Sequence, residues 1–102
     1  MHEDPKQAIF RVLQQIPVGT VTTYGRVASL AGLGKASRYV GTTLKHLPKG
    51  TQLPWHRVIN SQGRISFPES HPGNALQREL LEREGVVVIN GKINLKQFLW
   101  QL

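Results

Sequence analysis

Two short helical patterns separated by a glycine-rich turn constrain the fold of this chain more than any other feature of its sequence. Thr23 can cap the first helix, and Gly34 or Ser37 opens the second after the turn Gly32-Leu33-Gly34. Apolar residues recur at helical spacing in both patterns: Val27, Ala28, Leu30 and Ala31 in the first, and Val40, Leu44 and Leu47 in the second. Two short helices joined by about three residues are typical of a helix-turn-helix.

The segments on either side of these helices predict a mixed fold. Asp4-Pro5 is typical of a helix start, and Pro17-Val18-Gly19 ends that helix. The β-prone runs 56–59 and 64–67 flank turn residues, which predicts a hairpin, or wing. The other expected elements are a helix over 77–84, a hairpin of 86–89 and 92–95 around Asn90-Gly91, and a short terminal helix over 95–102. We therefore expect an α+β winged helix-turn-helix DNA-binding domain that spans residues 1–102 as one unit.

Charged residues are distributed unevenly along the chain. The formal net charge is +7, yet the stretch from Pro5 to Pro68 contains no acidic residue. Nine basic residues lie in that stretch: Lys6, Arg11, Arg26, Lys35, Arg38, Lys45, Lys49, Arg57 and Arg64. Such a segment favours a polyanionic partner, and a basic surface that only keeps the protein soluble is the alternative. Arg38, Thr42 and Lys45 share one face of the second helix of the helix-turn-helix, where such a helix contacts phosphates and base edges.

The absence of cysteine excludes several kinds of site. The 102 residues contain no cysteine, which rules out a disulfide scaffold, a thiolate zinc site and a cysteine nucleophile among them. No apolar run approaches the roughly 18 residues of a membrane span, and the polar start Met1-His2-Glu3-Asp4-Pro5 is not typical of a signal peptide. His2, His46 and His71 lack the spacing of metal ligands. We therefore expect no membrane partner, no metal and no cofactor.

His56 and Glu84 form the pair of side chains with the clearest chemical potential. A histidine oriented by a carboxylate can act as a general base, but covalent catalysis also needs a nucleophile beside it. The residue before His56 is Trp55, whose indole N–H is only a donor. Ser61 and Ser66 cannot be placed near His56 from the sequence. The alternative is a buried polar network that joins the predicted wing to the next helix.

Four segments, in order, resemble the O6-alkylguanine-DNA alkyltransferases. The segment Leu53-Pro54-Trp55-His56-Arg57-Val58-Ile59 resembles the active-site signature Pro-Cys-His-Arg-Val, with tryptophan in place of the alkyl-accepting cysteine. The other three are Val18 to Gly25, Lys35 to Gly41, and Gln77 to Leu81 with Glu84-Gly85. Tryptophan at this place marks the alkyltransferase-like proteins, which lack the family's N-terminal domain. The resemblance implies the fold of the C-terminal domain of the alkyltransferases.

The resemblance also implies roles for residues that match the family. Tyr24 would press on the phosphate backbone and help to rotate the target nucleotide out of the duplex. Arg38 would enter the duplex and fill the gap that the flipped base leaves. Trp55 would form a wall of the lesion pocket, which Tyr24 would also line. Val58 and Ile59 would lie nearby, at the pocket or on the strand beneath it.

Other matches and mismatches modify this expectation. His56 and Glu84 match the proton-relay positions of the family, and without a cysteine we expect them to be structural. Leu47-Pro48 stands where the alkyltransferases have an Asn-Pro turn, and Phe67 to Gly73 replaces their Tyr-Ser-Gly-Gly lid. The size and the alkyl preference of the pocket are therefore expected to differ from those of the enzymes.

The hypothesis is a DNA-damage sensor and not an enzyme. It would bind double-stranded DNA, flip O6-alkylguanine into a pocket and mark it for nucleotide excision repair, a partner that only the resemblance implies. We expect a monomer, in the cytoplasm at the nucleoid or in the nucleus of a eukaryote. Two rivals stay open. One is an enzyme that uses water with His56 and Glu84, and the other is a winged-helix regulator that reads undamaged sequence as a dimer.

Overall fold

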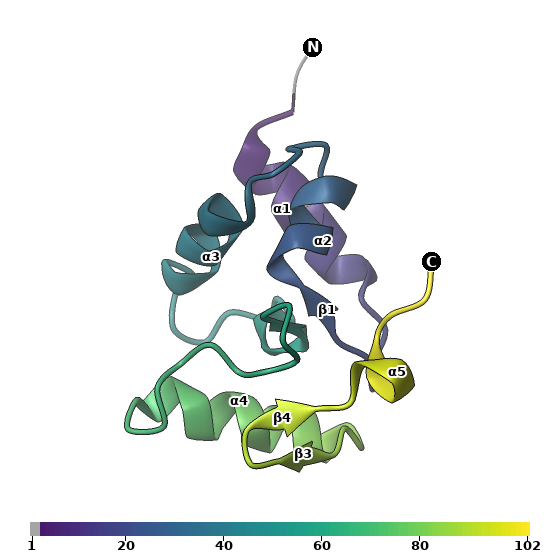
Figure 1. Cartoon of the computed structure of the whole chain (residues 1–102). Coiled ribbons are helices and arrows are strands. Elements are labelled where there is room, and N and C mark those ends of the chain that lie inside the picture. The colour runs from purple at the N-terminus through teal and green to yellow at the C-terminus, as the bar shows by residue number, and fades with distance from the viewer. Residues whose placement is uncertain (1–2) are drawn as a thin grey trace.

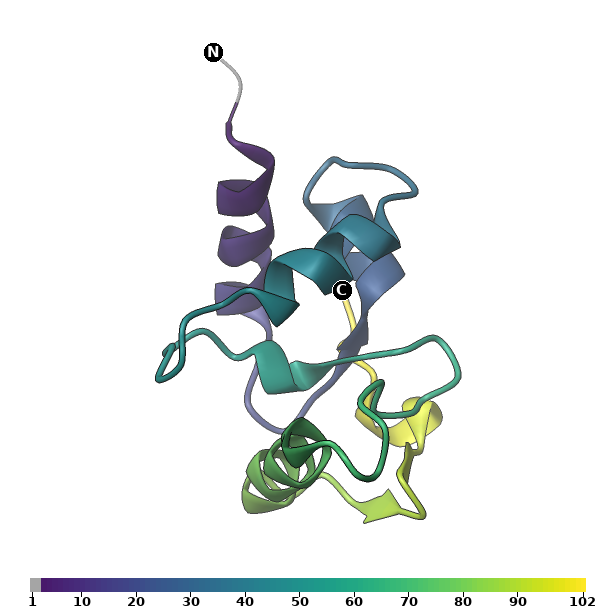
Figure 2. The same cartoon turned by 90° about the vertical axis from the view of Figure 1, so that its left-hand side faces the viewer.

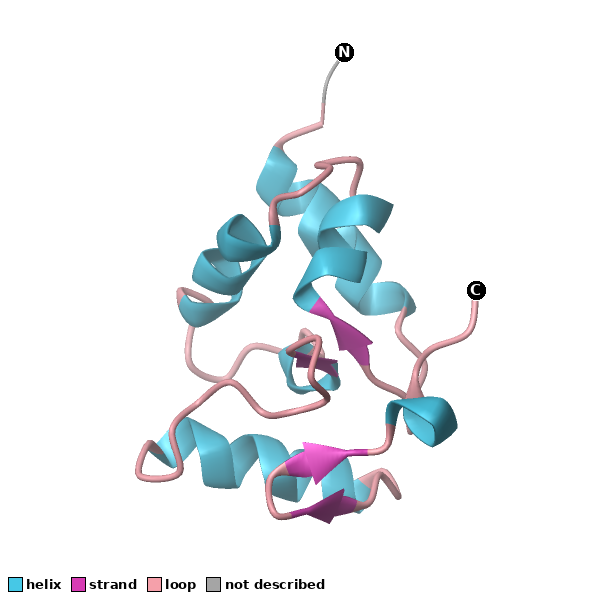
Figure 3. Cartoon of the chain, in the orientation of Figure 1, coloured by secondary structure: helices cyan, strands magenta, loops and turns pink. Residues whose placement is uncertain are grey.

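Helices are the main regular elements of the computed structural model, which describes residues 3–102 (Figures 1 and 3). The helices are α1 (Pro5–Gln15), α2 (Tyr24–Leu30), α3 (Ser37–Lys45), α4 (Pro72–Arg83) and α5 (Leu95–Phe98), with a 3-10 turn η1 (Trp55–Arg57). The strands are β1 (Thr22–Thr23), β2 (Val58–Ile59), β3 (Val88–Ile89) and β4 (Lys92–Ile93). Met1 and His2, which belong to the start judged unlike a signal peptide, lie outside the described residues. Across residues 3–102, every helix is too short or too polar to cross a lipid bilayer.

The helix-turn-helix predicted from the sequence is present as α2 and α3. Thr23 caps α2, because its Oγ1 accepts a hydrogen bond of 3.3 Å from the backbone N–H of Arg26. The connection covers residues 31–36, so it is longer than the predicted turn. Gly32 and Gly34 both adopt positive φ there, at 76° and 65°, which a side chain would disfavour.

The strand pairing corrects the predicted wing. Val58 and Ile59 pair in parallel with Thr22 and Thr23, and not with residues 64–67 as an antiparallel hairpin. The Asn60 side chain accepts hydrogen bonds from the backbone N–H groups of Gln62 (2.9 Å) and Arg64 (3.0 Å). These bonds fold 60–64 into a turn, after which the chain leaves as a loop.

The second predicted hairpin is confirmed, and two predicted helix boundaries change. β3 and β4 pair antiparallel around Asn90 and Gly91, whose φ values of 52° and 73° suit a tight turn. α4 begins at Pro72 and not near residue 77, because the His71 ring accepts a bond of 2.9 Å from the N–H of Gly73 and caps the helix. α5 ends at Phe98, and the chain beyond it runs beside β1.

Two buried clusters of side chains hold these elements together. The first joins α1, α2 and α3 and includes Val58 and Trp100. The second includes Val21, Ile59, Leu81, Val86 and Ile93. Successive residues of a strand point to opposite faces, so β2 sends one side chain into each cluster. The parallel pair β1–β2 therefore fixes the helix-turn-helix relative to α4 and the C-terminal hairpin.

Candidate nucleic-acid interface

A pocket of about 600 Å³ opens between the helix-turn-helix and the loop before α4. Tyr24 from α2, Arg38 and Lys45 from α3, and Trp55 from η1 all line it. The other lining residues are Ser37, Gly41, Leu44, Ser66, Phe67, Pro68, His71 and Gln77. The pocket thus brings together residues from segments that are distant in the sequence, beside the α3 helix that Figure 2 turns toward the viewer.

The charged side chains that line the pocket are both cations. Arg38 and Lys45 lie at its α3 side, and no carboxylate occurs among the described residues that line it. The remaining walls are mostly apolar or aromatic. A positive rim around an apolar hollow suits a planar base whose phosphates stay outside.

Aromatic rings build the wall opposite α3. Trp55 meets Phe67 edge to face, with ring centroids 6.2 Å apart, and Phe67 stacks on His71 at 4.7 Å. Asn74 Nδ2 donates to the Phe67 carbonyl at 2.8 Å. A Cβ on Gly73 would lie 2.9 Å from the Phe67 ring, so glycine allows this close packing. Sequence analysis noted this segment as a changed lid and did not assign Phe67 and His71 to the pocket.

Four predicted site residues lie outside this pocket: Thr42, Val58, His56 and Glu84. Thr42 is exposed on α3, and its carbonyl oxygen is 2.8 Å from His46 Nδ1. Val58 is 1% exposed and belongs to the first core cluster. Of the two places expected for it, Val58 therefore occupies the strand, in β2, and does not form pocket surface.

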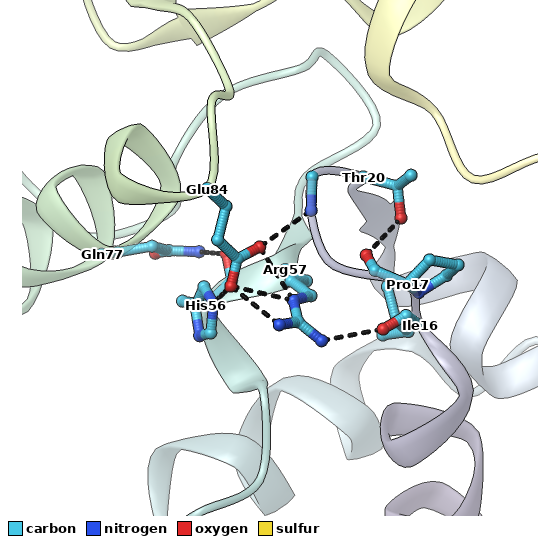
Figure 4. A network of polar contacts seen from close by, with 8 residues as sticks. Ile16, Pro17, Thr20, His56, Arg57, Gln77 and Glu84 are labelled. Carbon is cyan, nitrogen blue, oxygen red and sulfur yellow. Dashed lines mark hydrogen bonds and ion pairs between the residues drawn. The ribbon is translucent and has the colours of Figure 1, made fainter.

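His56 and Glu84 meet, as the sequence suggested, but within a larger network (Figure 4). His56 Nε2 lies 2.7 Å from Glu84 Oε2. Arg57 donates to the same carboxylate through Nε and Nη2, at 2.7–3.2 Å, and through Nη1 to the Ile16 carbonyl at 2.8 Å. The N–H of Gly19 donates to Glu84 Oε1 at 3.1 Å. Sequence analysis counted Arg57 only as charge, although arginine is the residue suited to a forked bond with a carboxylate.

This network fixes the ionisation of Glu84. Burial by itself raises the pKa of the Glu84 carboxyl, but hydrogen bonds from Arg57, His56 and Gly19 together outweigh burial and lower the pKa from 4.5 to about 2. The His56 ring is held by this carboxylate and does not line the pocket. The network joins η1, the end of α4 and the loop after α1 through one carboxylate.

Comparison with known proteins assigns the family. A family model described as 6-O-methylguanine DNA methyltransferase, DNA binding domain, matches residues 4–86. This chain belongs to that family. A DNA base-flipping protein of Vibrio parahaemolyticus is 49% identical over 96 residues, which cover 91% of this chain and 92% of that protein.

A relative from Schizosaccharomyces pombe matches nearly all of this chain, both in sequence and in structure. The alkyltransferase-like protein 1 of Schizosaccharomyces pombe is 39% identical over 98 residues, which cover 91% of each protein. The crystal structure of S. pombe Atl1 with damaged DNA that contains O6-carboxymethylguanine matches with a TM-score of 0.91, at 37% identity, over 100% of both chains. The predicted α+β fold and the resemblance to alkyltransferase-like proteins are therefore confirmed.

His56 and Glu84 pair with each other, but no further metal-ligating side chain joins them in the described residues. Among residues 3–102, no three His, Asp or Glu side chains are grouped as metal ligands would be. The polar groups that face the pocket are instead hydroxyls, cations and one histidine, which can hydrogen-bond a base or a phosphate directly.

Proposed function

We propose that this protein is a non-enzymatic sensor of O6-alkylguanine in double-stranded DNA. In this proposal α3 lies on the duplex, the damaged nucleotide rotates out, and its base enters the pocket with the alkyl group intact. The observation that carries the proposal is the convergence of Tyr24, Arg38 and Trp55 on one pocket beside α3. The base-flipping relative and the S. pombe structure with damaged DNA support it.

The pocket and α3 supply what base flipping requires energetically. Extruding a base costs a few kcal/mol, and less when the base is damaged and poorly paired. The planar guanidinium of Arg38 can stack in the gap, where a lysine could not. The Trp55–Phe67 wall offers an apolar surface to the extruded base. Lesion binding is therefore expected to exceed binding to undamaged DNA.

The absence of a cysteine nucleophile argues against repair of the bound lesion by this protein. The chain has no cysteine, and Trp55 stands where the alkyltransferase signature has its acceptor. His56 is paired with Glu84 and is not among the residues that line the pocket. We propose that the bound protein, acting as a monomer, marks the lesion for nucleotide excision repair, as the resemblance implies. Its place in the cell would be wherever the DNA is, the nucleoid or the nucleus.

Two matched duplexes test the function. One carries O6-methylguanine and the other guanine at the same position, and both are titrated at a single salt concentration because phosphate contacts make all affinities salt-dependent. Tighter binding of the lesion, with the methyl group still present afterwards, is the expected result. Equal binding would contradict a sensor and favour a general or sequence-reading DNA binder. Loss of the methyl group would contradict the absence of catalysis.

Substitution of Arg38 tests its role in filling the gap. Arg38→Ala removes both a charge and a stacking plane, whereas Lys45→Ala removes a charge at the same pocket. We expect the first change to weaken lesion binding about tenfold more than the second, because stacking in the gap is worth about 1–3 kcal/mol. Arg38→Lys serves as the control that keeps the charge. Full affinity of Arg38→Lys would show that charge alone matters.

A further inference from the structure

We propose that a groove beside the C-terminal hairpin docks an acidic, partly apolar segment of another protein. The groove has a volume of about 790 Å³ and lies between β3, β4, α5 and the turn at residues 61–64. It shares no lining residue with the lesion pocket. The hairpin and α5, which line the groove, lie apart from α3 in both views (Figures 1 and 2).

Apolar side chains face outward along β3 without a folding reason. Val88 packs against the second core cluster, while its neighbours Val87 and Ile89 are 52% and 65% exposed. The alternation of a strand would place polar residues at those two positions if they met only water. Both residues line the groove, and Leu95 and Phe98, which pack on the second cluster, lie at its base. Exposed apolar surface of this kind indicates an interaction site.

Positive charge lies beside this apolar surface. Ile89 is directly opposite Lys92 in the β3–β4 register, so the two side chains share one face of the hairpin. Lys96 and Arg64 also line the groove, and Arg64 Nη1 donates to the Asn90 carbonyl at 3.3 Å, which holds its guanidinium at the edge. No acidic residue lines the groove among the described residues.

Charge complementarity and apolar content together define the occupant. The three cations favour carboxylates, and Val87 and Ile89 favour aliphatic or aromatic side chains. A polypeptide segment can supply both, whereas the backbone of DNA supplies only the charge. The family match to the DNA-binding domain ends at residue 86, so most of the groove lies beyond the part of the chain assigned to DNA. This inference does not rest on the proposed lesion function.

A synthetic peptide in which Asp and Glu alternate with Leu and Ile is the probe. Amide NMR of the labelled full chain is recorded with this peptide, with a version that has Lys for each acidic residue, and with a version that has Ser for each aliphatic residue. We expect shifts at Ile89, Lys92 and Lys96 with the first peptide, and binding about tenfold weaker with the other two. No shift at the groove, shifts centred on α3, or equal binding of the three peptides would overturn the proposal.

Two substitutions with matched controls complete the test. Ile89→Ser and Lys92→Glu are each expected to weaken binding of the acidic peptide about fivefold, as for a central interface residue. The controls are Val18→Ser, since Val18 is 68% exposed outside the groove, and Lys6→Glu on α1. If Ile89→Ser instead weakens binding to undamaged DNA, or abolishes self-association of the free protein, the groove serves DNA or a second copy. No lesion is used, so failure here leaves the lesion sensor untouched.

Discussion

The Glu84 carboxylate at the end of α4 ties together the η1 segment and the loop after α1. It contacts His56 and accepts hydrogen bonds from Arg57 of η1 and from the N–H of Gly19 in the loop after α1. Arg57 also donates to the Ile16 carbonyl. The side chains of His56, Arg57 and Glu84 are only 12–14% exposed. A buried ion pair adds little net stability compared with apolar side chains of the same volume. Removal of one partner, however, leaves the other charge buried and unpaired, at a cost of about 3–5 kcal/mol.

Stability is expected to fall in acid because of this residue. The pKa of Glu84 is about 2 in the folded protein against 4.5 ordinarily, so the unfolded chain takes up the proton first as the pH falls. The contribution is present above about pH 5 and is lost toward pH 2, and it amounts to about 3 kcal/mol. Urea unfolding between pH 7 and pH 2 measures the loss.

Glu84→Gln isolates this contribution from that of other carboxylates. The variant should be about 3 kcal/mol less stable at pH 7 and should approach the native protein in stability near pH 2. Glu79→Gln is the matched control, because Glu79 is 59% exposed in its pair with Arg83 and should change stability by less than about 1 kcal/mol. A constant difference between Glu84→Gln and the native protein at every pH would contradict the assignment.

At the scale of elements, local signals were predictable and distant pairings were not. Asn90-Gly91 specifies its own turn, and Asp4-Pro5 its own helix start, because these residues act on the backbone beside them. The β1–β2 pair joins residues 22–23 to 58–59, and a parallel pairing leaves no mark in the sequence next to either strand. The predicted wing failed for that reason, and the early start of α4 was missed because histidine is an uncommon cap.

The candidate site also contains residues that the sequence predicts and residues that it does not. Tyr24, Arg38 and Trp55 follow from motifs, and the structure brings them to one pocket. Phe67 and His71 lie in a loop whose path depends on the hydrogen bond from Asn74 and on packing over glycine. No periodic pattern marks such a loop, so its rings could not be assigned to a wall beforehand.

Gln77 is the link between α4 and the segment that carries Trp55. Its side chain is 1% exposed, and its Nε2 donates to the carbonyls of His56 (3.0 Å) and Val58 (2.9 Å). Gln77→Met keeps the volume and leaves both carbonyls unpaired, so we expect a loss of about 2 kcal/mol and weaker lesion binding. Chemical denaturation and the duplex titration measure both effects. Arg78→Met, at an exposed position on the same helix, should change neither.

Across the whole molecule, residues near the two ends of the chain share one core. Trp100 is 9% exposed in the cluster that contains Ile9 and Leu13 of α1, and its N–H donates to the Val21 carbonyl at 2.8 Å. Arg26 of α2 also donates to the Trp100 carbonyl, at 3.2 Å. The C-terminal segment therefore packs against the helix-turn-helix and stabilises it.

Trp100→Ala is expected to destabilise the entire protein by about 3–5 kcal/mol, because it leaves a cavity in the first core. On warming, we expect α3 to unfold and DNA binding to be lost in a single transition. Circular dichroism and DNA affinity measure this transition. Leu102→Ser is the control, since Leu102 is 72% exposed. Two separate transitions would show that the two core clusters unfold independently.

The shared core also has a consequence during synthesis. A ribosome makes α1, α2 and α3 well before Trp100, so these three helices emerge with one side of their core still open. The nascent chain can complete that core only once residue 100 has left the exit tunnel. Full DNA affinity is therefore expected only after residue 100 is made, and translation that stops before it yields a polypeptide that proteases can remove.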